Sequence, residues 1–323
     1  MIKKSDRSQP LDFSGLKTTS LLKSPRKVKV GDFARPLSAG AKFSEFWRNG
    51  IPEILAGTAL KKLARSIAQA HVRKKEVILA MGAHAIKVGL SPLIIDFMKR
   101  GIITALAGNG AVAIHDFEIA LAGHTSEEVE SALEDGTFGA ARETGEAFNA
   151  VAAACLNGET GFGEALGELI LSRKLENRDL SLFANALSLG IPATVHVAIG
   201  TDIVHIHPGL DGAGLGAGSL RDFGIFAKAV SKLEGGVFIN LGSAVIMPEV
   251  FLKAVSLARN LGYKLEKFTA ANLDFVAQYR SHTNVLKRPT SKGGTPIGLI
   301  GHHELMLPLL FAGVLEELAG GKQ

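Results

Sequence analysis

Short apolar runs that end in glycine and lead into an amphipathic stretch recur along the chain. The clearest are Leu79–Leu90 (LAMGAHAIKVGL) and Ala105–Asp116 (ALAGNGAVAIHD), where an apolar strand passes through a small-residue turn into a helix. In a parallel sheet such turns meet at the carboxyl ends of the strands, where ligands bind. We therefore expect Gly82, Gly108 and Gly110 to lie close together and to let a ligand approach the backbone.

The same alternation of strand and helix patterns continues to the end of the chain. The predicted strands span residues 76–83, 102–107, 192–200, 236–241, 265–271 and 296–300. The predicted helices span residues 51–74, 125–133, 138–156, 162–173, 180–189, 219–233, 248–260 and 304–318, with one more that begins at Ser91 as its cap. This pattern predicts an α/β fold with a doubly wound, mostly parallel six-stranded sheet and helices on both faces. We expect residues 45–323 to form a single α/β domain behind a basic extended arm, residues 1–44.

Composition narrows the class of protein. Of 323 residues 46% are hydrophobic, and the mean hydropathy is +0.22, which suits a large buried core. The apolar runs are too short to span a bilayer, and no apolar segment follows the charged first residues, so we expect a cytoplasmic protein without membrane contact. The single cysteine, Cys155, lies in an alanine-rich helix pattern, which favours packing over a nucleophilic role.

The net charge of +5 is concentrated near the start of the chain. Only Asp6, Asp12 and Asp32 oppose the basic residues Lys3, Lys4, Arg7, Lys17, Lys23, Arg26, Lys27, Lys29 and Arg35. A basic arm of this kind can meet nucleic acid or an acidic partner. Because aromatic residues do not alternate with the basic ones, we expect a solvated or subunit-docking arm and no nucleic acid.

A second small-residue turn strengthens the case for a nucleotide site. Asn240–Ala244 follows a predicted strand and precedes a predicted helix, as Ala107–Ala111 does. Neither turn matches the dinucleotide or Walker glycine patterns, and tight packing explains one such turn as well as a ligand does. Two of them at strand ends favour a nucleotide or dinucleotide that contacts Gly242 and Ser243 as well as the first turn.

Histidines suggest a metal-dependent alternative. His205 and His207 alternate, so on a strand they would share one face, and Asp202 or Asp211 could add a carboxylate ligand. His302 is a candidate for a further ligand. The other interpretation is that these histidines only form hydrogen bonds in a polar crevice.

Two charged residues are candidates for amine chemistry. Lys292 stands beside Gly293 in a loop, where a desolvated lysine can act as a nucleophile toward imines, although a solvated basic loop has the same pattern. Glu249 follows Pro248 at a predicted helix start. A carboxylate there can act as a base or bind an ammonium group, or it simply stabilises the first turn.

A series of matches, in order along the chain, resembles the deoxyhypusine synthase family. They begin with Gly31–Phe33 and the two strand-turn runs, and the likeness covers about residues 30–318. The later matches are Ile191–Pro192 with Gly200–Asp202, Ile225–Lys228, Leu241–Val250 and Leu305–Leu310. Members of this family are homotetramers that bind NAD and take the aminobutyl group of spermidine through a lysine imine.

The resemblance implies roles for residues of this chain. It implies a deoxyhypusine-synthase-like, Rossmann-like homotetramer that transfers an aminoalkyl group from a polyamine or another small amine. The implied catalytic residues are Lys292 as the imine-forming lysine, with Asp202 and Glu249 holding the amine. The implied NAD-binding residues are Gly82, His84, Gly108, Asn109, Gly110, Gly242, Ser243 and His303.

Three functions therefore stay open from the sequence. The first is the NAD-dependent aminoalkyl transferase. The second is a metal-dependent hydrolase or lyase that uses His205, His207 and His302. The third is a non-catalytic oligomeric scaffold or binding protein on the same fold.

Overall fold

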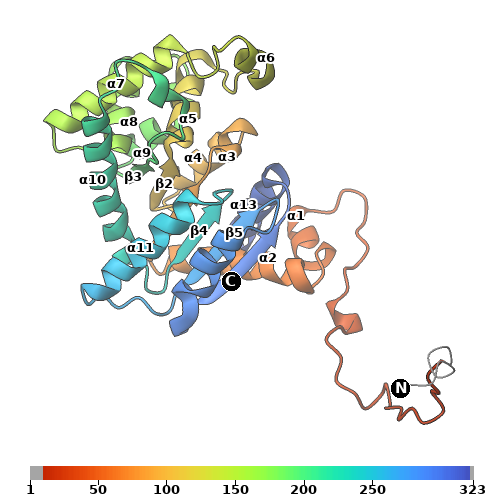
Figure 1. Ribbon diagram of the computed structural model, residues 1–323. Helices are drawn as coiled ribbons and strands as arrows, with labels where there is room; N and C mark the ends of the chain where they lie inside the picture. The colour runs from red at the N-terminus through yellow and green to blue at the C-terminus, as the bar shows by residue number, and fades with distance from the viewer. Residues whose placement is uncertain (1–9, 321–323) are drawn as a thin grey trace, which may run out of the picture. The chain divides into compact units, whose positions relative to one another are not determined.

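A computed structural model describes residues 10–320 of the chain (Figure 1). The first basic residues of the predicted arm, Lys3, Lys4 and Arg7, lie outside the described residues. The chain divides into two compact units, Met1–Ile54 and Leu55–Gln323. No helix among the described residues is long and apolar enough to cross a membrane.

The first unit carries little regular structure. Among described residues 10–42 the only helical element is the 3-10 turn η2 (Val30–Asp32), and α1 (Phe43–Glu45) and the π-helical turn η3 (Phe46–Gly50) follow. Backbone hydrogen bonds hold the unit's end together: Arg35 N–H donates to Asn49 O at 2.8 Å, and Glu53 N–H to Asp32 O at 2.9 Å.

The second unit is built on a six-stranded parallel sheet in the order β3-β2-β1-β4-β5-β6. The strands are β1 (Val77–Met81), β2 (Ala105–Asn109), β3 (Ala193–His196), β4 (Val237–Leu241), β5 (Thr269–Asp274) and β6 (Thr295–Ile300). β1 and β4 are buried along their whole length, as expected for central parallel strands. The predicted doubly wound sheet is confirmed.

Helices occupy the connections between the strands. The α-helices are α2 (Leu55–Val72), α3 (His84–Lys87), α4 (Ser91–Lys99), α5 (Gly110–Ala122), α6 (Val129–Glu134), α7 (Arg142–Asn157), α8 (Phe162–Ser172), α9 (Leu182–Ser188), α10 (Gly212–Ser231), α11 (Ile246–Asn260), α12 (Tyr279–Ser281) and α13 (His303–Gly320). The shorter helical turns are η4 (Arg178–Leu180), η5 (Ile203–Ile206), η6 (His282–Lys287) and η7 (Pro289–Lys292).

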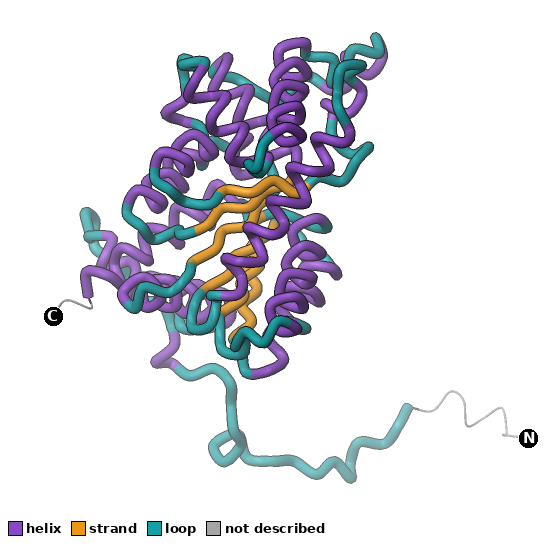
Figure 2. The backbone as a smooth tube through the Cα atoms, turned by 90° about the vertical axis from the view of Figure 1, so that its left-hand side faces the viewer, coloured by secondary structure: helices purple, strands orange, loops and turns teal. Residues whose placement is uncertain are grey.

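Both faces of the sheet are covered (Figure 2). On one face α10 and α11 pack on the apolar side chains of β1, β2 and β4, and Phe238 of β4 stacks on Phe251 of α11 with ring centroids 3.6 Å apart. On the other face α2 contacts β1, β4, β5 and β6 and packs against α13, and Phe97 of α4 stacks on Phe311 of α13 at 3.7 Å. Two apolar layers therefore cover the two faces of the sheet, and the ends of the strands are the places left for a site.

Buried carboxyl groups anchor the helices beside β2 and β3. Asp222 of α10 accepts hydrogen bonds from the N–H groups of Val195 (2.7 Å) and Gly163 (2.9 Å). Asp116 of α5 accepts from the Ser181 hydroxyl (2.5 Å) and the Leu182 N–H (2.6 Å) at the start of α9. Burial raises the pKa of Asp116 to about 6 and that of Asp222 to about 7. No local sequence pattern marks either carboxyl as an anchoring group.

Several element boundaries differ from those predicted. β2 begins at Ala105, three residues later than expected, and β3 ends at His196, four residues early. α10 begins at Gly212 because Asp211 caps it, accepting from the Ala213 N–H at 2.8 Å. Ser91 is the first helical residue of α4 and not its cap. Each correction moves an end of an element and leaves its type unchanged.

Candidate active site

The predicted small-residue turns lie at one edge of the sheet. Gly82 follows β1, Asn109 ends β2 and Gly110 comes after it, and Gly242 and Ser243 follow β4. These three strands are neighbours in the order β2-β1-β4. The connections run in opposite directions from β1, toward β2 on one side and toward β4 on the other. The carboxyl ends of β1 and β4 therefore form the topological switch point, where doubly wound folds bind their ligands.

The missing side chains of the turn glycines make room for other parts of the protein. A Cβ on Gly82 would lie 2.5 Å from the carbonyl oxygen of Gly242, and a Cβ on Gly110 would lie 2.1 Å from Oδ2 of Asp202. A Cβ on Gly108 would lie 2.7 Å from that of Val112. The expectation that these glycines leave bare backbone for a ligand is corrected, because protein atoms occupy that space.

Three rings lie together at this edge. His84 and His303 meet edge to face with ring centroids 5.3 Å apart, and Phe275 lies 5.9 Å from His84 and 6.3 Å from His303. His303 packs against Gly242, where a Cβ would come within 2.4 Å of the ring atom Cε1. His84 and Phe275 are exposed, whereas His303 is buried. We call His84, Phe275 and His303 the ring cluster.

One nitrogen of the ring cluster is buried without a partner. His303 Nε2–H donates to the carbonyl oxygen of Leu273 at 3.2 Å, so Nδ1 carries a lone pair. Nδ1 is buried and has no hydrogen-bond partner among the described residues. Burial lowers the pKa of His303, which keeps the ring neutral and Nδ1 an acceptor. Nδ1 is therefore an unsatisfied buried acceptor at the switch point.

Ser243 and Asn240 fix the turn after β4. The Ser243 hydroxyl accepts from the Met247 N–H at 3.2 Å in the first turn of α11. The backbone carbonyl oxygen of Ser243 accepts from Asn240 Nδ2 at 2.8 Å. Asn240 Nδ2 also donates to Asn272 Oδ1 at 2.7 Å. The Ser243 side chain is therefore used inside the protein, and only the backbone of this turn can meet a ligand.

Asp202 and the start of α5 border a pocket of about 450 Å³. The Asp202 carboxylate packs against Gly110, the first residue of α5, where the helix dipole favours a negative charge. Burial raises the pKa of Asp202, and the nearby His205 opposes that shift. Because a carboxylate already takes this helix end, a phosphate group would be repelled from it, whereas an ammonium group would be attracted.

A hydrogen-bonded chain of side chains lines the same pocket. His115 Nδ1 lies 2.5 Å from the Thr125 hydroxyl, which donates to Glu118, and the Thr144 hydroxyl donates to the other Glu118 oxygen at 3.2 Å. The sequence did not predict this series of hydrogen bonds. The available signal was the spacing of His115 and Glu118, which puts them on one helix face, but nothing local marked Thr125 as their partner.

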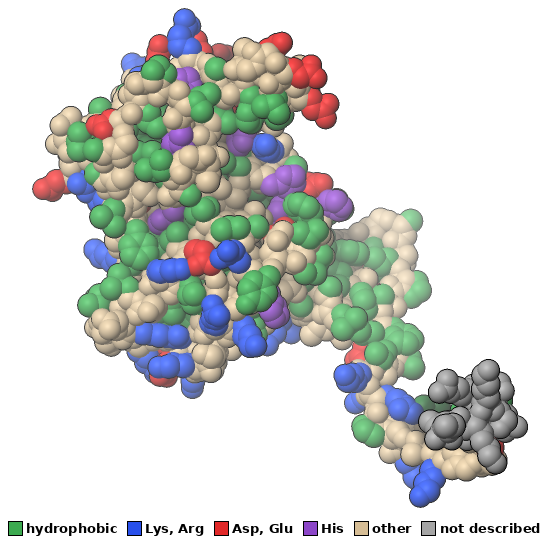
Figure 3. Space-filling model, viewed as in Figure 1, with side chains coloured by type: hydrophobic (Ala, Val, Ile, Leu, Met, Phe, Trp, Pro, Cys, Tyr) green, Lys and Arg blue, Asp and Glu red, His purple; other side chains and the backbone are tan. Residues whose placement is uncertain are grey.

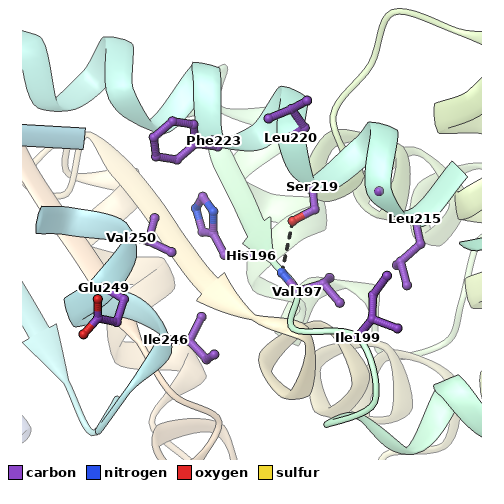
Figure 4. A pocket seen from close by; sticks show the side chains of 11 residues that line it. His196, Val197, Ile199, Leu215, Ser219, Leu220, Phe223, Ile246, Glu249 and Val250 are labelled. Carbon is purple, nitrogen blue, oxygen red and sulfur yellow. Dashed lines mark hydrogen bonds between the residues drawn. The ribbon is translucent and has the colours of Figure 1, made fainter. Parts of the chain in front are cut away.

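A second pocket, of about 380 Å³, lies between α10 and α11 beyond β3 (Figure 4). Its polar groups are already used: His196 Nε2 pairs with the Thr194 hydroxyl at 3.0 Å, and the Ser219 hydroxyl accepts from the Val197 N–H at 3.0 Å. Burial lowers the pKa of His196 to about 3, so it stays neutral. Apart from Glu249, the side chains that line this pocket carry no charge.

Glu249 borders that second pocket and is fully paired. Its carboxylate accepts from Arg280 Nη1 at 2.9 Å and Asn284 Nδ2 at 2.8 Å, and it bonds Lys253 one turn along α11. These contacts lower the pKa of Glu249, with the Lys253 hydrogen bond as the main cause. The predicted role in holding an amine is corrected, because Glu249 ties α11 to η6.

The histidines proposed as metal ligands point to different partners. His205 lies in η5 and not on a strand, and its Nδ1 accepts from the N–H groups of Gly200 (3.0 Å) and Asp202 (3.1 Å). His207 Nε2 bonds the carbonyl oxygen of Gly139 at 3.1 Å, and His302 is exposed beside Glu304. No group of three or more metal-ligating side chains occurs among the described residues. The metal hypothesis required His205 and His207 to share one face of a strand. They do not do so in the part of the chain that the structure describes.

Lys292 lies at the opposite edge of the sheet from the turns. It ends η7 just before β6, and the neighbouring Gly294 packs against the carbonyl oxygen of Phe268, which precedes β5. The amino ends of parallel strands share one edge, so the structure does not bring Lys292 together with Asp202 or the turns. Lys87, at the end of α3, lines the Asp202 pocket instead.

Charge is unevenly spread over the face drawn in Figure 3. Acidic side chains gather around α6, where residues 127–135 contain Glu127, Glu128, Glu130, Glu134 and Asp135 and no lysine or arginine. Lysines and arginines gather over the lower part of this unit. Since Glu127 and Val129 line the Asp202 pocket, the acidic segment favours the approach of a cationic ligand.

The fold is that of a doubly wound α/β protein, and the turns after β1 and β4 meet at its topological switch point. Neither a protein-family model nor a curated protein matches the chain. Among solved structures, the chain is similar to a protein from Entamoeba histolytica provisionally named a deoxyhypusine synthase, with a TM-score of 0.52 and 11% identity over 87% of this chain and 95% of that one.

Two further solved structures share the fold. One is a conserved protein of Methanococcus maripaludis provisionally named LOR/SDH, with a TM-score of 0.52 and 17% identity over 84% of this chain and 72% of that one. The other is AgrE in ternary complex with ornithine and NAD+, with a TM-score of 0.51 and 14% identity over 83% of this chain. The chain spans about a third of the length of AgrE (34%) and of the cyanobacterial arginine dihydrolase ArgZ (33%). At these identities the likeness shows a shared fold.

Proposed function

We propose that the protein is an NAD-dependent enzyme that oxidises a small amine, such as a polyamine. NAD would lie at the carboxyl ends of β1 and β4, and the amine in the pocket beside Asp202. The observation that carries the proposal is the unpartnered Nδ1 of His303, buried beneath exposed rings at the topological switch point. The binding of ornithine and NAD+ by AgrE, on a similar fold, supports this pairing of ligands.

The residues at this edge suit a dinucleotide. The exposed His84 and Phe275 offer ring surfaces against which a nicotinamide or adenine can pack, and His303 Nδ1 offers an acceptor for an amide, amine or hydroxyl donor. The backbone of the turns after β1 and β4 lies beside them. Bound NAD would supply the oxidising chemistry. The chain's own part is to hold the amine next to it with the Asp202 carboxylate.

The aminoalkyl transfer implied by the sequence resemblance needs a lysine near the amine. Lys292 lies at the amino edge. We therefore propose that Lys87, which lines the pocket, is the lysine that forms the imine. Assembly into homotetramers belongs to the same proposal, and light scattering of the purified protein would measure it.

Calorimetric titration with NAD tests the cofactor part of the proposal. The unmodified protein should bind NAD, and Phe275→Ala should weaken binding by about fivefold, since a ring contact contributes about 1 kcal/mol. Tyr263→Ala is the matched control, because both aromatic residues are 53% exposed and Tyr263 follows α11 outside the ring cluster. Absence of NAD binding, or equal losses in the two variants, would contradict the proposal and favour the non-catalytic scaffold.

A further inference from the structure

The pocket beside Asp202 contains a histidine whose orientation is set by two other side chains. His115 and Glu118 lie one turn apart on α5, and Thr125 lies beyond the end of that helix. The Thr125 hydroxyl has a single proton and donates it to Glu118, so toward His115, at 2.5 Å, it can only accept. His115 must then carry its proton on Nδ1.

These hydrogen bonds leave Nε2 of His115 free to accept a hydrogen bond from a ligand. With Nδ1 protonated, a neutral His115 has a lone pair on Nε2, and none of the hydrogen bonds among described residues uses that atom. His115 lines the pocket, so Nε2 is the nitrogen that a ligand can reach. A structural histidine of a core normally satisfies both nitrogens.

Glu118 provides a negative charge at the end of the hydrogen-bonded series that starts at His115 and passes through Thr125. Burial acts to raise its pKa, but His115, whose Nδ1 lies 3.7 Å from the carboxylate, and the hydrogen bonds from Thr125 and Thr144 outweigh burial, so the pKa of Glu118 is lowered. The carboxylate therefore stays ionised at neutral pH. Through Thr125 it makes His115 Nδ1–H a better donor and Nε2 a better acceptor, as a carboxylate does for a metal-bound or catalytic histidine.

The pocket also holds charges suited to a cation. The acidic side chains that line it, besides Glu118, are Asp202, Glu127 and Glu143, and the basic and titratable ones are Lys87 and His124. Carboxylates outnumber lysines, so an ammonium group gains from entering. The apolar side chains of Ile114, Leu121 and Ile203 line the remaining wall and suit a methylene chain.

We propose that His115 is a binding residue of this pocket: its Nε2 accepts a hydrogen bond from the primary ammonium of the amine, while Thr125 and Glu118 are positioning residues that fix the tautomer. The inference rests on the proposed function for the identity of the amine, but its geometry stands on the pocket alone.

Nitrogen-detected NMR of the histidine rings and calorimetry with spermidine test this role in the full-length protein. The His115 signal, assigned with His115→Gln, should show the Nδ1–H tautomer, and Thr125→Val should remove that preference. Thr125→Val and His115→Gln should each lower spermidine affinity about tenfold, the usual loss for one charge-assisted hydrogen bond. Thr125→Ser, which keeps the hydroxyl, should restore both the tautomer and the affinity.

Two controls separate a specific role from general damage. Thr144→Val removes the hydroxyl that binds the other Glu118 oxygen and should leave the tautomer of His115 unchanged. His124→Gln, at the other histidine that lines the pocket, should leave both the tautomer of His115 and the spermidine affinity unchanged.

The outcomes also distinguish this inference from the proposed function. An Nε2–H tautomer in the unmodified protein, or spermidine affinity that Thr125→Val leaves unchanged, would overturn the role of His115. If spermidine binds as expected while NAD does not bind, the proposed oxidation fails and the role of His115 stands. Thr125→Val should leave NAD affinity unaltered, since the ring cluster lies on other elements.

Discussion

Replacing Gly110 with alanine should destabilise the protein and disturb the amine pocket together. Gly110 is the first residue of α5, and an added Cβ would lie 2.1 Å from Oδ2 and 2.6 Å from Cγ of Asp202. Ordinary contact begins at 3.4 Å, so the carboxylate must retreat by more than 1 Å from the helix start. That movement loses the charge's interaction with the helix end and strains the turn before η5.

The expected loss follows from these two effects. Overpacking of a close contact costs about 1–3 kcal/mol, and the lost helix-end interaction adds about 0.3–1 kcal/mol. Gly224→Ala in α10 is the matched control, because nothing lies within 4 Å of its added Cβ. That variant should gain about 0.5–1 kcal/mol, since alanine favours a helix over glycine.

Urea denaturation of the two variants, followed by circular dichroism, measures the difference. Gly110→Ala should unfold at lower urea than the unmodified protein, and Gly224→Ala at higher urea, with equal slopes. Spermidine affinity should fall only in Gly110→Ala. If Gly110→Ala were as stable as Gly224→Ala, Asp202 would not be packed on the start of α5 and could not form this wall of the amine pocket.

Three further predictions concern buried or reactive side chains. Because the pKa of Asp222 is raised to about 7 from 3.8, its protonation stabilises the fold below about pH 4, and that stability is lost as the pH rises to about 7; Asp222→Asn should flatten this slope in a pH series of denaturation by up to about 1 kcal/mol per pH unit, and an unchanged slope would refute it. Burial raises the pKa of the Cys155 thiol to about 11, so a thiol reagent should label it only after unfolding, and rapid labelling of the native protein would contradict its buried position. Borohydride reduction in the presence of NAD and spermidine should attach an aminoalkyl group to Lys87, and mass spectrometry that finds the label on Lys292 instead would show that the amine does not react in this pocket.

The sheet was predictable from the sequence because parallel strands are buried on both faces and appear as short apolar runs. The runs around Ile78 and Phe238 became β1 and β4, which are buried throughout. Boundaries were harder: Ile102 and Ile103 are apolar and buried, yet they precede β2, because burial alone does not distinguish a strand from the loop that leads into it.

The site was only partly predictable. The turns at Gly82 and Gly242 lie at one edge as expected, but the sequence could not show that each glycine accommodates a protein atom. The position of Lys292 could have been predicted from the sequence, since a residue that precedes a parallel strand lies at the amino edge. The hydrogen bond between His115 and Thr125 could not have been predicted, because a hydroxyl beyond a helix end has no fixed spacing from a residue within the helix.

Hydrogen exchange measured by mass spectrometry, with and without NAD, tests most directly whether the switch point is the cofactor site. Bound NAD should slow exchange in peptides that contain His84, Ser243 and Phe275, and should leave peptides from the apolar pocket of α10 unchanged. Protection confined to α10, or no protection at saturating NAD, would contradict a dinucleotide site between β1 and β4.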